Sequence, residues 1–218
     1  MSTELDACVA AVRARLRDNG LDARAPVETC EGLLCGYRDG VVRITLPTLS
    51  SPEGVLRSTM LGAMMGLDAR EVAWLFEALL PRLVAHELGH ALRDEAGLLG
   101  DDVCAEEQIA DRVATLAART LIDARDVLRA KELLSTVTAR LGGVALAASL
   151  HRHSEEVRRK LGLTVSREES QRARAALQTD YWRDVSAYLR LTSAWAWLDL
   201  TLDEKDDFDA ICRDHFSR

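Results

Sequence analysis

The segment LVAHELGHAL, residues 83–92, places two histidines and a glutamate at a spacing that suits metal-assisted hydrolysis. His86 and His90 are four residues apart, so on a helix both imidazoles lie on one face and can bind the same metal ion. Glu87 lies about 100° around the helix from His86, where its carboxylate can take a proton from a water on that metal. The pattern indicates a zinc site with Glu87 as general base.

A hydrolytic zinc site needs a third protein ligand and keeps its fourth position for water. The segment AEEQIADRVA offers Glu106, Glu107 and Asp111, which follow His90 by 16, 17 and 21 residues. We interpret Glu107 as the third ligand. Asp111, one helical turn later, would accept a hydrogen bond from a ligand histidine and fix its tautomer. Glu106 is the alternative ligand, because it lies next to Glu107 in the chain.

The elements that must position these residues are mostly helices. Asp68 followed by Glu71 predicts a capped helix start, and Pro81 predicts either the opening of the next helix or a kink before the motif. Gly97 supplies a stop for the motif helix. Helical segments are expected at 4–18, 54–65, 104–122, 124–142, 144–162, 166–200 and 203–216.

Over residues 32–46 the spacing of the hydrophobic residues changes from that of a helix to that of β-strands, which predicts one small β-hairpin. Asp39-Gly40 separates two β-prone runs, and both residues tolerate the positive φ that a tight hairpin turn requires. The expected fold class is therefore mostly α (α+β). We expect one domain over 1–141, followed by a helical extension over 142–218 that packs on the same domain.

Composition excludes several classes of function. The chain has 218 residues, is 48% hydrophobic and carries a net charge of −7 without long blocks of either sign, which argues for a globular protein that does not bind nucleic acid. Its weakly charged stretches are far shorter than the roughly 20 residues that span a bilayer. With no export signal visible, we expect a cytoplasmic location, no membrane association and reduced thiols at Cys8, Cys30, Cys35, Cys104 and Cys212.

HELGH followed by EQIAD resembles the gluzincin pattern, in which a Glu-x-x-Ala-Asp segment on the next helix supplies the third zinc ligand. Within that group the chain is most similar to the ImmA/IrrE-type metallopeptidases, over residues 37–125. The HtpX-type membrane zincins share both motifs, but the lack of membrane spans argues against that branch. The resemblance implies a zincin-like domain with one zinc ion per chain, which hydrolyses a peptide bond in a protein substrate.

The resemblance also implies how substrate binds. Such enzymes commonly hold substrate as an extra strand against a sheet edge, and the second strand of the hairpin is the candidate for this docking. The substrate would be a regulatory protein, such as a transcriptional repressor, whose gene lies near the gene for this chain. The docking strand comprises Val41, Val42, Arg43, Ile44, Thr45 and Leu46.

Three residues are candidates for the group that stabilises the transition state: His151, His153 and Tyr181. Two other functions are compatible with parts of the pattern. Glu87 with His90 also forms a Glu-x-x-His pair, as in di-iron helical bundles, but no other histidine has a glutamate three residues before it. The remaining alternative is a catalytically inactive, zinc-stabilised protein-binding module, which would tolerate Glu87→Gln.

Overall fold

The computed structural model describes residues 2–30, 35–100, 103–134, 136–137 and 209–216. Within these ranges the chain is mostly helical with one small sheet, as expected from the sequence. A further helical segment lies at 124–134. The labelled helices are α1 (Ser2–Asp18), α2 (Pro52–Met65), α3 (Ala69–Ala78), α4 (Leu80–Glu95), α5 (Val103–Ala118) and the π-helical turn η1 (Cys212–Phe216).

The sheet has the strand order β1-β3-β2, with β1 at Val27–Thr29, β2 at Gly36–Arg38 and β3 at Val41–Ile44. The expected hairpin is confirmed: β2 and β3 are antiparallel, and their turn holds Asp39 at φ 55° and Gly40 at φ 75°. Strand β1 was not expected from the sequence. It pairs with β3 in parallel, so β3 is the central strand.

The position of β3 corrects the prediction that residues 41–46 dock a substrate strand. Val42 pairs with Val27 on one side and with Tyr37 on the other, so the backbone groups of β3 are already used by two neighbours. The regular strand also ends at Ile44, and Thr45 and Leu46 follow it as irregular chain. An added strand can pair only with an outer edge, on β1 or on β2.

Local signals set the helix boundaries before the motif. The predicted capping box at the start of α3 is present: the Asp68 carboxylate accepts from the backbone N–H of Glu71, and the Glu71 carboxylate accepts from that of Asp68. Helix α3 ends at Ala78 and α4 begins at Leu80. Pro81 is thus at the second position of α4, where its missing N–H leaves no helical hydrogen bond unmade.

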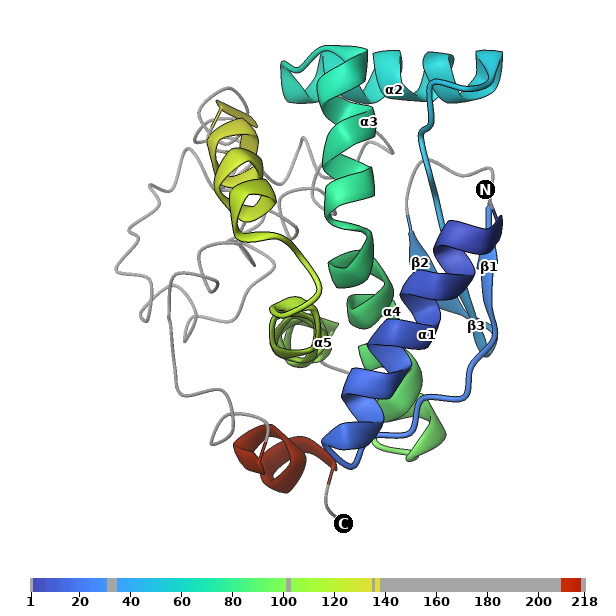
Figure 1. The fold of residues 1–218 in the computed structure, drawn as a ribbon. Helices are drawn as coiled ribbons and strands as arrows, with labels where there is room; N and C mark the ends of the chain where they lie inside the picture. Colours follow the sequence, from blue (N-terminus) through green and yellow to red (C-terminus); the bar gives the residue numbers. More distant parts are fainter. Residues whose placement is uncertain (1, 31–34, 101–102, 135, 138–208, 217–218) are drawn as a thin grey trace, which may run out of the picture.

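The motif helix α4 lies at the centre of the domain. Figure 1 shows α1 crossing α4, with the sheet on one side of α4 and α5 on the other. Val12 and Leu16 of α1, Val84 and Leu88 of α4, and Ile44 of β3 are all fully buried in one cluster. Because α4 is packed on several sides, its side chains are held in fixed directions.

The described end of the predicted C-terminal extension, residues 209–216, packs on this domain. Ile211 is buried in the same cluster as Leu16, and the Cys212 thiol donates to the carbonyl of Asn19 at 3.5 Å. In Figure 1 this turn lies beside the end of α1. Of the helices in the described ranges, none is long and apolar enough to cross a membrane.

Candidate metal centre

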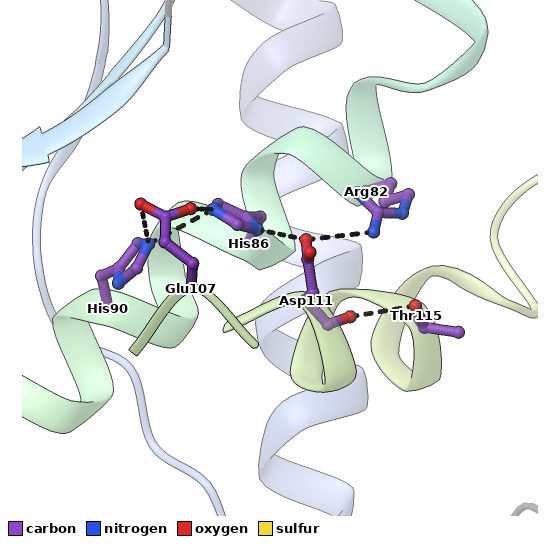
Figure 2. Close-up of polar contacts among 6 residues, drawn as sticks. All are labelled: Arg82, His86, His90, Glu107, Asp111 and Thr115. Carbon is purple, nitrogen blue, oxygen red and sulfur yellow. Dashed lines mark hydrogen bonds and ion pairs between the residues drawn. The ribbon is translucent and has the colours of Figure 1, made fainter. Parts of the chain in front are cut away.

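His86 and His90 of α4 and Glu107 of α5 bring three ligand atoms together (Figure 2). The two Nε2 atoms are 3.2 Å apart. Glu107 Oε2 lies 3.4 Å from Nε2 of His86, and Glu107 Oε1 lies 3.9 Å from Nε2 of His90. The three residues predicted as ligands therefore form a group that could hold a metal ion.

The spacing of these atoms suits zinc. With bonds of about 2.0–2.2 Å to nitrogen and oxygen, a tetrahedral zinc ion holds its donors roughly 3.3 Å from one another. The 3.2 Å between the two Nε2 atoms and the 3.4 Å between His86 Nε2 and Glu107 Oε2 match that value, and the 3.9 Å contact of His90 is to the other oxygen of Glu107. Two imidazoles and one carboxylate are also a donor set used by hydrolytic zinc enzymes, in which a fourth position stays open. The residues present thus fit a zinc ion.

The charges at the site favour a cation between these residues. Burial lowers the pKa of His86, but hydrogen bonds to Asp111 and Glu107 outweigh it and raise that pKa to about 10. Burial and the charge of His86 lower the pKa of His90 to about 4. Without metal, one proton is therefore held on His86 beside two carboxylates. A metal ion would replace that proton.

Glu87 is buried next to the cluster, with an exposed fraction of 8%. The backbone N–H of Tyr37, on strand β2, lies near its carboxylate and favours the charged form. Burial raises the pKa of Glu87 to about 7, although the charge of His86 and the N–H of Tyr37 act in the opposite direction. A carboxylate whose pKa lies near neutrality can both take and return a proton, as a general base must.

Asp111 makes the contact that the sequence predicted. Its Oδ1 lies 2.9 Å from Nδ1 of His86. This places the proton of a neutral His86 on Nδ1 and leaves Nε2, which faces His90 and Glu107, to bind metal.

Glu106, the alternative third ligand, is held elsewhere. Both of its oxygens accept from the Arg93 guanidinium, at 2.7 and 3.0 Å, and Oε1 also accepts from the backbone N–H of Gly100 at 3.0 Å. The bonds from Arg93 lower the pKa of Glu106. A turn of about 100° along α5 separates Glu106 from Glu107, so only Glu107 joins the histidines.

Helices α4 and α5 approach closely at the centre of this group. A Cβ built on Gly89 would lie 3.0 Å from Cα and 3.3 Å from Cβ of Ala110. Gly89 lies between the two histidines in sequence, and Ala110 lies between Glu107 and Asp111. The small residues of HELGH and EQIAD therefore let the two ligand-bearing helices cross at short distance.

Arg82 was missed by the sequence analysis. Its guanidinium Nη2 lies 3.2 Å from Asp111 Oδ1, and its side chain is 1% exposed. A signal was available, because Arg82 precedes His86 by one helical turn and so places a charge on the same inward face of α4. His151, His153 and Tyr181, the candidates for transition-state stabilisation, lie outside the described residues.

Comparison of the chain with protein-family models, with curated proteins and with solved structures finds no match.

Proposed function

We propose that this protein is a zinc-dependent metallopeptidase with a zincin-like domain, one zinc ion per chain and Glu87 as general base. The observation that carries the proposal is the convergence of His86, His90 and Glu107 beside a buried glutamate. Zinc bound there would lower the pKa of a water in its open position and polarise the scissile carbonyl. The chain itself would supply three ligands and the proton acceptor.

The surroundings of Glu87 support its role. The carboxylate lies near the backbone N–H of Tyr37, and its burial keeps the pKa near neutrality. In a zinc-stabilised binding module, by contrast, nothing requires a buried acid at this position. A buried carboxylate without a full counter-charge is costly to the folded state, and such a cost is commonly tolerated at functional sites.

The outer edge of β2 is the place that we propose for an extended substrate. Tyr37 pairs with Val42, and the Val42 N–H bonds to Pro26 on the far side of β3. The backbone groups of Tyr37 therefore point away from β3, toward the outer edge of β2 and the side on which Glu87 lies. A strand added along β2 would place its backbone next to the general base.

The resemblance of HELGH and EQIAD to ImmA/IrrE-type enzymes extends the proposal to the substrate. It favours a regulatory protein, such as a transcriptional repressor, encoded near this chain.

The proposal is tested by co-expressing the wild type or Glu87→Gln with each protein encoded beside this chain. Both forms should carry about one zinc per chain, and only the wild type should cleave its substrate. Equal cleavage by Glu87→Gln would remove Glu87 from the mechanism. Zinc in both forms with no cleavage by either would favour the binding module.

A further inference from the structure

One carboxylate oxygen connects two side chains of α4. Oδ1 of Asp111 lies 2.9 Å from Nδ1 of His86 and 3.2 Å from Nη2 of Arg82 (Figure 2). Arg82 and His86 are one helical turn apart, and Asp111 faces both from α5. A chain of contacts thus runs from the Arg82 guanidinium through Asp111 to the ring of a candidate metal ligand.

Arg82 supplies what the histidine alone does not. With zinc bound, the neutral imidazole of His86 would offer Asp111 only a polar N–H, whereas Nη2 of the guanidinium, at 3.2 Å, brings a full positive charge. The side chain of Asp111 is 15% exposed, so solvent screens it little, and a carboxylate this buried needs a charged partner. Among the described residues, the hydroxyl of Thr115 donates to the backbone carbonyl of Asp111, at 2.9 Å, and not to its carboxylate.

The direction of the Asp111 carboxylate decides the direction of the His86 ring. His86 can give its Nε2 lone pair to a metal only when Nδ1 carries the proton and the ring faces His90 and Glu107. Asp111 enforces both conditions by accepting from Nδ1. If Asp111 rotated away, His86 would keep its place on α4 but lose its fixed ring orientation.

We propose that Arg82 is a positioning residue of the metal centre, which acts through Asp111 to hold His86 ready for zinc. The inference rests on the proposed zinc site but not on peptidase activity. Residues that orient metal ligands from the outer shell typically change metal affinity 10–100-fold when they are removed. A buried arginine that served only to join α4 to α5 would change the stability of the fold and leave zinc affinity unaltered.

The test is a double-mutant cycle read out with Zn²⁺ alone, by competition with a chromophoric chelator. Arg82→Met should weaken zinc binding about tenfold or more, and Asp111→Asn by a similar factor. In the Asp111→Asn background, Arg82→Met should have less than about a twofold further effect, because its route to His86 is already broken. Arg82→Lys, which keeps the positive charge on a shorter side chain than that of arginine, should fall between the wild type and Arg82→Met.

Arg43→Met is the control, because it breaks the Arg43–Glu28 ion pair on the sheet, at 3.1 Å, and should leave zinc affinity at the wild-type value. Should Arg82→Met not fold, Arg82→Lys and Arg82→Gln enter the same cycle. Wild-type affinity in the Arg82 variants, or an undiminished effect in the Asp111→Asn background, would overturn the role of Arg82 alone. A wild type that binds no zinc would overturn the proposed function as well, whereas zinc binding without peptidase activity would leave the role of Arg82 standing.

Discussion

Gly89 of α4 meets Ala110 of α5 at the point where the two ligand-bearing helices cross. A Cβ on Gly89 would lie 3.0 Å from Cα of Ala110, which is closer than side chains normally pack against backbone. The contact places the His86–His90 face of α4 against the Glu107–Asp111 face of α5. The separation of the two helices therefore sets the distances among the ligand atoms.

Gly89→Ala should weaken zinc binding more than it weakens the fold. Better helix propensity contributes about 1 kcal/mol, and the tight contact with Ala110 costs about 1–3 kcal/mol, so the free energy of unfolding should fall by no more than about 2 kcal/mol. The helices must still separate by a few tenths of an ångström, which displaces Glu107 from the histidines. Zinc titration and urea unfolding of the same variant measure the two effects, and unchanged zinc affinity would show that the crossing distance does not control the site.

Glu107→Gln should remove most of the zinc, whereas Glu106→Gln should retain it. Glu107 Oε2 lies 3.4 Å from Nε2 of His86, while Glu106 is engaged by Arg93. Glu106→Gln breaks a buried ion pair and should instead lower the free energy of unfolding, by about 3 kcal/mol or more. For this matched pair of variants, metal analysis after dialysis measures the zinc that is retained, and thermal unfolding measures the stability. Greater zinc loss in Glu106→Gln would move the third ligand by one residue.

Zinc affinity should rise with pH. The pKa of His86 is raised to about 10 in the zinc-free protein, so below that pH the ring is protonated and zinc must displace the proton. The pKa of Glu87 is about 7, so this group is already ionised at higher pH. From about pH 8 to about pH 9 the affinity should therefore increase about tenfold, with about one proton released per zinc. Calorimetry in buffers of different ionisation enthalpy counts the protons, and a pH-independent affinity would contradict the protonated state of His86.

Glu87→Gln should stabilise the zinc-free protein at alkaline pH. The pKa of Glu87 is raised from 4.5 to about 7 by burial. The unfolded chain therefore loses this proton more readily than the folded one, and the native state loses stability as the pH rises from 4.5 to 7. At about pH 8 the variant should be more stable by about 1–3 kcal/mol, and below about pH 4.5 the gain should vanish. Urea unfolding at both pH values checks this, and a variant of lower stability at about pH 8 would be inconsistent with a costly buried charge.

The sequence correctly predicted the features that depend on interactions between residues close together in the chain. The capping box of Asp68 and Glu71 and the turn at Asp39-Gly40 depend on residues within one turn of each other, and both are present. The i, i+4 spacing likewise placed His86 and His90 on one face before any tertiary information was needed.

Features that depend on long-range packing could not be predicted in the same way. Strand β1 has three residues and pairs with β3 across 15 positions of chain, so no local pattern shows it, and the central place of β3 was missed with it. Glu107 was already the predicted third ligand, and the contact of Glu106 with Arg93 adds the reason that Glu106 does not join the histidines. The sequence places Arg82 one helical turn before His86, but only the structure shows that Arg82 contacts Asp111.

The most direct test of the central claim is digestion of a mixed, proteome-derived peptide library by the zinc-loaded protein, with new peptide termini identified by mass spectrometry. Zinc-loaded wild type should generate new termini, and these should disappear after chelation and in zinc-loaded Glu87→Gln. The absence of new termini from zinc-loaded wild type, or their equal production by Glu87→Gln, would contradict a peptidase in which zinc and Glu87 act together.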